Sequence, residues 1–132
     1  VQTANTTSIS TTSTSFVTTN FTASITPRFS TSKILVLVSG GNINQNTTGA
    51  SSILTLYRGV TNLAAGNLGF SVINNSAGSI QSGQSFNYLD SPATTSSTTY
   101  TVYYRTSVGG GGTVAINSSN GIFTITLLEI AA

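Results

Sequence analysis

The sequence of 132 residues contains no cysteine, no histidine and no tryptophan. Without cysteine there is no disulfide and no thiolate metal site, and without histidine a Ser-His-Asp or Cys-His catalytic group and the usual zinc ligands are excluded. The only carboxylates are Asp90 and Glu129, and a glycosidase pair would need them about 5 to 9.5 Å apart. We expect them at opposite ends of the domain. The sequence therefore predicts no enzyme, no catalytic residue, no metal site and no cofactor.

Charge is also scarce: Lys, Arg, Asp and Glu make up 5% of the residues, and the net charge is +2. Nucleic-acid binding calls for a clustered basic face, which so few charges do not supply. No apolar run approaches the roughly 20 residues that span a bilayer, so we expect no membrane insertion. In place of charge, 45 residues are Ser or Thr. This predicts a surface of hydroxyl and amide groups.

Strong helix formers are few, with one Glu, one Lys and no Met, while β-branched and aromatic residues fill the apolar runs. About eight short strands separated by turns indicate an all-β sandwich or barrel, as one domain over residues 1–132. Residues 1–15 are rich in Ser and Thr and could be a linker, but we favour a short strand followed by a polar loop. The expected strands are Val1–Ala4, Phe16–Thr26, Lys33–Ser39, Ser52–Arg58, Ser82–Leu89, Thr98–Thr106, Thr113–Asn117 and Ile122–Ile130, with a possible short one at Asn67–Ile73.

Two turns have a clear sequence signal. Gly40-Gly41 is expected to close the strand 33–39. In Asp90-Ser91-Pro92, the Asp90 side chain can accept a backbone hydrogen bond while Pro92 fixes φ, so the chain should reverse there. We therefore expect a structural role for Asp90.

Strands 33–39, 98–106 and 122–130 are apolar or aromatic on both faces. A strand of an antiparallel sandwich in water should alternate, so these strands need a second surface to pack against. In so small a chain without helices, that surface would be another copy of the chain. The alternative is that Thr and Tyr of these strands simply face solvent.

Three stretches of the chain carry a resemblance: Phe21–Ser39 (FTASITPRFSTSKILVLVS), Tyr88–Arg105 (YLDSPATTSSTTYTVYYR) and Val114–Ala132 (VAINSSNGIFTITLLEIAA). Their landmarks are ITP-x-x-S-x-SKILV, an LDSP turn before a Tyr-rich strand, and the closing ITLLEIAA. They resemble the C-terminal domain of tailed-phage fibre and appendage proteins, those of marine cyanophages among them. The strand order is also similar to the jelly roll of the complement C1q and tumour necrosis factor group.

The resemblance implies an antiparallel eight-strand jelly-roll sandwich that assembles as a homotrimer. In it, strands 33–39, 98–106 and 122–130 lie together in an inner sheet, whose outer face packs around the threefold axis. The expected interface residues, or their neighbours of opposite parity, are Ile34, Val36, Tyr100, Val102, Ile125 and Leu127.

The same strand order predicts where the charges lie, because successive strands run alternately up and down. Only Asp90 is expected at the top. Lys33 and Glu129 should form an ion pair between neighbouring antiparallel strands, worth roughly 0 to 1 kcal/mol if exposed. The base would face other virion proteins and would hold Arg28, Lys33, Arg58, Arg105 and Glu129.

Together these features predict a non-enzymatic module on a virion surface: the trimeric knob of a tail fibre or appendage that presents polar loops to host glycans. Host recognition is expected in loop 40–51, at Asn42, Asn44, Gln45 and Asn46, with help from loop 90–97. The alternative is a capsid decoration or cement protein that stabilises the shell and contacts no host. Such a protein should bury its basic pole or a flank against the shell.

Overall fold

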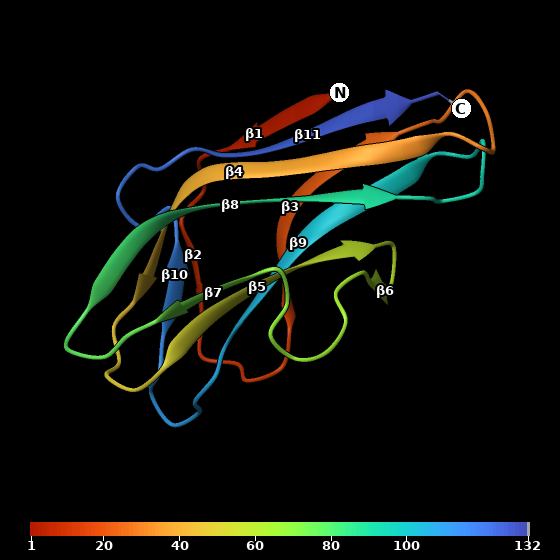
Figure 1. Cartoon of the computed structure of the whole chain (residues 1–132). Helices are drawn as coiled ribbons and strands as arrows, with labels where there is room; N and C mark the ends of the chain where they lie inside the picture. The colour runs from red at the N-terminus through yellow and green to blue at the C-terminus, as the bar shows by residue number, and fades with distance from the viewer. Residues whose placement is uncertain (132) are drawn as a thin grey trace.

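The computed structural model describes residues 1–131, and every regular element in that range is a β-strand (Figure 1). The prediction of an all-β fold is confirmed; Ala132, the last residue of the expected domain, lies outside the described residues. None of the described residues belongs to a helix of the length and apolarity that a membrane span requires. The strands are β1 (Gln2–Asn5), β2 (Ile9–Thr11), β3 (Val17–Ile25), β4 (Lys33–Gln45), β5 (Ser51–Arg58), β6 (Thr61–Asn62), β7 (Ser71–Asn74), β8 (Ile80–Asp90), β9 (Thr98–Thr106), β10 (Val114–Ile116) and β11 (Phe123–Ile130).

These strands form two antiparallel sheets. The first has the order β1-β11-β4-β10-β2, with β8 also paired to β4, and the second has the order β3-β9-β5-β6, with β7 also paired to β5. The pairing is nested, with β1 on β11, β3 on β9, β4 on β8 and β5 on β7. Nested antiparallel pairing folded into two sheets is jelly-roll-like, which agrees with the predicted fold class at that level.

Within residues 1–131 there are eleven strands, not the eight of the prediction. Strands β2 and β6 were not predicted, because three and two residues are too few to show a periodicity. The possible strand at Asn67–Ile73 is β7, which begins four residues later, at Ser71.

Strand β4 does not end at Gly40-Gly41, so the predicted turn there is wrong. The strand continues to Gln45, with a shift of register against β8 between Gly40 and Ile43. Both glycines have positive φ, 86° and 71°, and the Gly41 N–H donates to the carbonyl of Ile122 over 2.6 Å. The glycines therefore form a β-bulge, a feature that uses the same left-handed backbone as a turn.

The three doubly apolar strands do not share a sheet. Strands β4 and β11 are antiparallel neighbours, as predicted, with Ile34 opposite Glu129. Strand β9 instead pairs with β3 and β5 in the second sheet, so its predicted place in the inner sheet is wrong. On its outer face Thr99 is exposed, Tyr103 and Arg105 are half-buried and Thr101 is buried, so the alternative interpretation, in which Thr and Tyr face solvent, holds for this strand only in part.

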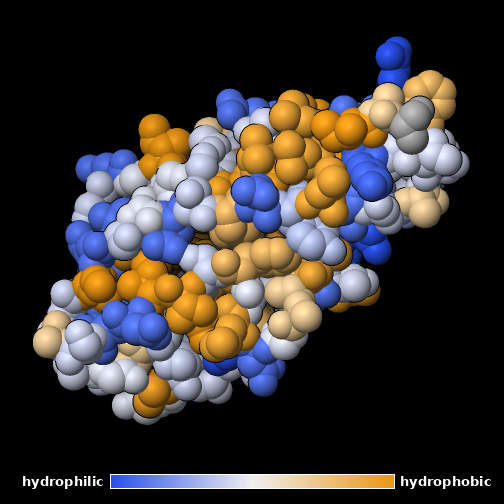
Figure 2. Space-filling model, in the orientation of Figure 1, coloured by the Kyte–Doolittle hydropathy of each residue, from blue (hydrophilic) through white to orange (hydrophobic). Residues whose placement is uncertain are grey.

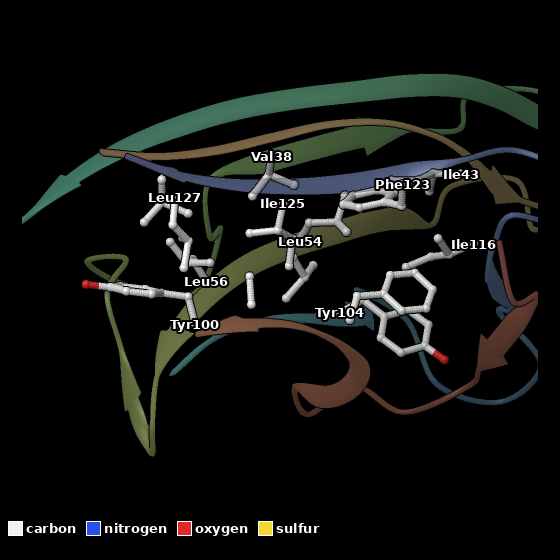
Figure 3. Close-up of a cluster of buried hydrophobic side chains, with 14 of the residues drawn as sticks. Val38, Ile43, Leu54, Leu56, Tyr100, Tyr104, Ile116, Phe123, Ile125 and Leu127 are labelled. Atoms are coloured by element: carbon white, nitrogen blue, oxygen red, sulfur yellow. The ribbon is translucent and has the colours of Figure 1, made fainter. Parts of the chain in front are cut away.

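One apolar core fills the space between the sheets (Figure 3). Side chains of β4 and β11 meet side chains of β5 and β9 there, and the rings of Phe21 and Phe123 contact each other across the sheets, 5.8 Å apart. A fully buried aliphatic side chain contributes about 1.5 to 3 kcal/mol. Figure 3 shows several of these residues: Val38, Leu54, Leu56, Tyr100, Ile125 and Leu127.

The six named candidates for the trimer interface belong to this core, and none is more than 1% exposed: Ile34, Val36, Tyr100, Val102, Ile125 and Leu127. Their assignment to a subunit interface is therefore wrong, because they already contact the opposite sheet of the same chain. Alternation along a strand leaves their neighbours of opposite parity to face outward.

Candidate functional site

The outer face of the first sheet carries a row of leucines. Leu128 pairs with Leu35, and Leu35 pairs with Leu89, so three leucines lie side by side across β11, β4 and β8. Leu128 is 44% exposed and Leu89 is 48% exposed. With Leu37 and Ile130, which point to the same side, we call this set the apolar face. Figure 2 shows hydrophobic residues gathered over this part of the molecule, which makes the apolar face a candidate contact surface.

A second distinctive surface is formed by three loops at one end of the sandwich, the loops 46–50, 75–79 and 107–113. None of them contains a charged residue. Figure 1 places this end far from Val1 and from the end of β11. We call it the uncharged pole.

Hydrogen bonds between the loops hold the uncharged pole in shape. Gly49 N–H donates to the carbonyl of Asn75 over 2.7 Å, and Asn75 N–H donates to the carbonyl of Ala50 over 2.9 Å. The buried Asn75 side chain donates to the carbonyls of Gln45 and Gly78. The pole is therefore a preformed surface of hydroxyl, amide and backbone groups.

The four predicted host-binding residues do not form one loop. Asn46 lies at the uncharged pole, where its side chain accepts a hydrogen bond from Thr113 N–H. Asn42 and Asn44 lie on the outer side of β4, and their amides are 3.4 Å from Gln81 and 3.3 Å from Ser79. Gln45 is fully buried, so its assignment as a receptor-binding residue is wrong.

Sequence reasoning missed Asn75, which organises the pole. Its side-chain oxygen accepts from the N–H of Ala77, two residues later. Asn followed by a Gly-containing polar stretch favours such Asx turns, and the segment Asn75–Ser79 carries that signal. The loop 90–97, which was expected to assist loop 40–51 in host recognition, lies at the opposite end of the sandwich, because Asp90 pairs with Ile34 at the start of β4.

That opposite end holds five of the six charged residues, and we call it the charged pole. The prediction also placed five charges together, but the exception differs: Asp90 lies at the charged pole, and Arg105 lies toward the other end. Because Asp90 takes the place of Arg105, the pole has a net charge of +1, whereas the five residues predicted for the base have a net charge of +3. Its members are Arg28, Lys33, Arg58, Asp90 and Glu129.

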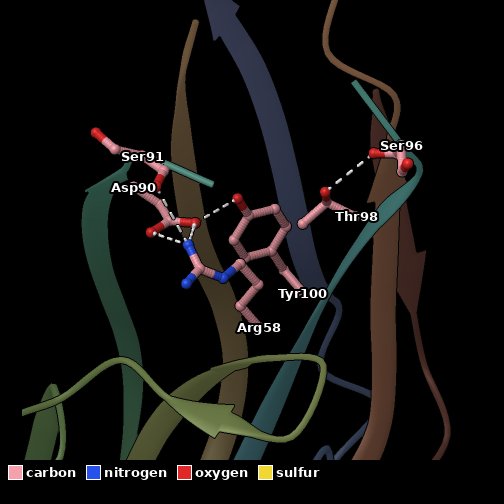
Figure 4. A network of polar contacts seen from close by, with 6 residues as sticks. All are labelled: Arg58, Asp90, Ser91, Ser96, Thr98 and Tyr100. Atoms are coloured by element: carbon pink, nitrogen blue, oxygen red, sulfur yellow. Dashed lines mark hydrogen bonds and ion pairs between the residues drawn. The ribbon is translucent and has the colours of Figure 1, made fainter. Parts of the chain in front are cut away.

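Asp90 joins the two sheets at the charged pole (Figure 4). Its carboxylate, on β8, accepts from Nη1 of Arg58 on β5 at 2.8 Å and from the Tyr100 hydroxyl on β9 at 2.7 Å. Asp90 is 5% exposed, and a buried carboxylate requires such partners. Its role is structural, as expected, but it binds side chains of the other sheet and not its own turn.

The predicted ion pair between Lys33 and Glu129 is wrong, although both residues lie at the charged pole. Glu129 pairs with the inward-facing Ile34, whereas Lys33 pairs with Ile130, so the two side chains project on opposite faces of the sheet. Glu129 accepts instead from the backbone N–H of Arg28 over 2.6 Å. The Ser32 hydroxyl and this N–H hold the pKa of Glu129 below its usual range.

The two carboxylates flank Ile34 from β8 and β11, so the expectation that they lie at opposite ends is also wrong. Two strand spacings place their Cα atoms roughly 10 Å apart. Asp90 is engaged by Arg58 and Tyr100, and Glu129 is held ionised, whereas a glycosidase acid must keep a proton. That the chain is not an enzyme stays a prediction.

By fold, the chain is an all-β, jelly-roll-like sandwich whose surface divides into an apolar sheet face and an uncharged loop pole. No protein-family model matches the sequence, and no curated protein matches it either. Among solved structures, a chain in the structure of the infectious bursal disease virus Gt strain is similar at 16% identity and a TM-score of 0.46. The likeness covers 100% of this chain and 38% of the viral chain.

Proposed function

We propose that this chain is a non-enzymatic module on the surface of a tailed-phage virion, where it forms the trimeric knob of a fibre or appendage. The sequence resemblance of three stretches to phage fibre and appendage domains supports the phage assignment. The observation that carries the proposal is the division of the surface. The apolar face suits contact with copies of the chain, and the uncharged pole suits contact with a host.

In the trimer, the apolar faces of three copies pack around the threefold axis. Each Leu that becomes well buried there contributes about 1.5 to 3 kcal/mol. The residues of the apolar face, which are the outward-facing neighbours of the core residues along the strands, thus form the subunit interface. The uncharged pole stays free, because its loops lie at the ends of the strands and not on the sheet face.

The uncharged pole binds host glycans in this proposal. Its hydroxyl and amide groups can both donate and accept, which suits the hydroxyls of a neutral sugar. The loops are already ordered by their mutual hydrogen bonds, so binding loses little conformational entropy.

Host-cell binding by the purified, labelled chain tests this proposal. Ser76 is exposed on loop 75–79, and we expect Ser76→Trp to block the pole and reduce binding to the host cells at least about tenfold. Ser118→Trp, on the exposed β10–β11 loop, is the matched control and should bind like the wild type. Undiminished binding by the Ser76→Trp trimer would show that the pole does not contact the host.

The capsid decoration function is the second candidate, and one observation favours it. Phe29 and Val60 are 55% and 95% exposed, and both lie at the charged pole, beside Arg28 and Arg58. Apolar side chains among charges are suited to contact with another virion protein. Co-sedimentation of the chain with capsids that lack it, together with no binding to host cells, would favour this function over the first.

A further inference from the structure

An open groove of about 440 Å³ lies on the outer face of the second sheet. This side of the sandwich is opposite the apolar face, so trimer packing leaves the groove accessible. The segment 14–16 and Asn67 of the β6–β7 connection both contact Arg105 there. The lining residues are Thr14, Ser15, Phe16, Tyr57, Asn67 and Arg105.

Arg105 is held in one orientation in this groove. Its Cζ lies 5.2 Å from the centre of the Phe16 ring. Its Nη1 donates to the carbonyls of Thr14 and Thr106, and its Nη2 donates to the carbonyl of Asn67 over 2.6 Å. The β2–β3 loop, the end of β9 and the β6–β7 connection thus fix the guanidinium before any ligand binds.

The Arg105 guanidinium keeps unused capacity for an anion. An arginine has five N–H donors, and the three hydrogen bonds within residues 1–131 leave Nε–H and one Nη2 hydrogen without a partner. The salt bridge that the described residues contain is Arg58 with Asp90, so Arg105 has no carboxylate of its own there. Nε and Nη2 share one edge of the guanidinium, and donors along one edge form a fork that can pair with both oxygens of a carboxylate.

Beside the guanidinium, the groove offers an aromatic ring and several polar groups. The rings of Tyr57 and Tyr103 stack with their centres 4.0 Å apart, which fixes the Tyr57 ring on the sheet surface. Three polar residues, Thr14, Ser15 and Asn67, line the groove together with this ring. A sugar ring requires this combination, because its C–H face packs on an aromatic ring while its hydroxyls need polar partners.

We propose that the groove binds an acidic saccharide, with the sugar carboxylate on the Arg105 fork and the sugar ring against Tyr57. The arrangement supplies a charge-assisted, bidentate contact and an apolar contact at once. The inference does not depend on trimer formation or on the uncharged pole, and it holds for the chain whatever particle carries it.

An NMR titration of the wild-type chain tests the proposal without any substitution. Methyl β-glucuronide and a methyl sialoside are the acidic probes, and methyl β-glucoside and acetate each lack one of the two features. We expect saturable shifts of the Arg105 Nε–H and the Tyr57 ring signals with at least one acidic probe. Glucoside and acetate should bind at least about tenfold more weakly. The proposal would be overturned if glucoside or acetate bound as tightly as the acidic probes, or if neither acidic probe gave a saturable shift.

Substitutions then locate the carboxylate contact. Arg105→Gln should abolish the preference for the acidic probe, and Arg105→Lys, which keeps the charge without the fork, should retain only part of it. Arg28→Gln at the charged pole is the matched control and should bind like the wild type. An Arg105→Gln chain that is folded and keeps the full preference would also overturn the assignment.

Discussion

At the residue scale, the Tyr100 hydroxyl is one of the links between the sheets, since it donates to Asp90 over 2.7 Å. Tyr100→Phe removes this donor and leaves a buried carboxylate with Arg58 alone. A hydrogen bond to a charged group contributes about 1.5 to 3 kcal/mol, so we expect the free energy of unfolding to fall by that amount in a urea titration. Tyr57→Phe, on the partly exposed outer face, is the control and should change it by less than about 0.5 kcal/mol. Equal effects of the two variants would contradict the structural role of Asp90.

The same tyrosine predicts how stability depends on alkaline pH. Burial raises the pKa of Tyr100 and of Tyr104, and the hydrogen bond to Asp90 raises that of Tyr100 further. Above about pH 10 the unfolded chain loses these phenolic protons while the folded chain keeps them, so the free energy of unfolding falls as the pH rises. The slope for each tyrosine approaches at most about 1.4 kcal/mol per pH unit. Urea titrations between pH 8 and 11 should show that the free energy of unfolding falls less steeply with pH for Tyr100→Phe than for the wild type. Identical slopes would show that Tyr100 does not cause the fall.

The Asp90 network could not be read from the sequence. Arg58 and Tyr100 lie 32 and 10 residues from Asp90, and neither spacing has a local meaning in β-structure. The LDSP segment showed that the chain turns after Asp90, but only the packing of β5, β8 and β9 shows what its carboxylate binds.

At the element scale, the predicted direction of β11 is correct although the predicted directions of β8, β9 and β10 are reversed. The prediction let successive strands run alternately up and down, but it did not count the β6–β7 segment as a strand. The expected directions of β8 and β9 are therefore reversed, and the predicted ends of the sandwich for Asp90 and Arg105 are exchanged. Residues 113–117 and 122–130 were then counted as successive antiparallel strands, whereas β10 and β11 both run antiparallel to β4. Because β10 and β11 in fact run in the same direction, this assumption gives β11 its correct direction. Hence Glu129 was placed correctly, and Asp90 was not.

The bulge of β4 gives a prediction with a matched control. Gly41 and Gly78 both have a φ of 71°, but a Cβ at Gly41 would clash with the Phe123 ring, whereas one at Gly78 would meet nothing within 4 Å. Gly78→Ala should cost about 1 to 2 kcal/mol for the backbone conformation alone. Gly41→Ala should cost about 1 to 3 kcal/mol more, because the core must shift. Urea unfolding measures both, and equal costs would contradict a bulge packed against Phe123.

At the scale of the whole molecule, two adjacent residues of β11 separate folding from assembly. Leu127 is fully buried in the core, and Leu128 is 44% exposed on the apolar face. Leu127→Asp places an unpaired charge in the core and should prevent folding, as judged by circular dichroism. Leu128→Asp should give a folded monomer. A folded Leu127→Asp chain, or a Leu128→Asp chain that remains trimeric, would show that the two faces are assigned wrongly.

The sequence predicted the positions of the strands better than it predicted their sheets or the surfaces. A doubly apolar run such as 33–39 has no alternation, so it does not reveal which residues face the opposite sheet. Of the host-binding candidates, Asn46 lies in a loop as expected, because it follows the last residue of β4. Gln45 was not, because an amide buried against Thr106 looks like any loop amide until the strand is seen to continue past Gly41.

The measurement that tests the account most directly is the mass of the wild-type chain in solution by multi-angle light scattering. If the apolar face is a subunit interface, the particle has three times the mass of one chain, and Leu128→Asp and Leu89→Asp each reduce it to one. A wild-type chain that stays monomeric over the whole accessible concentration range would contradict the trimeric knob.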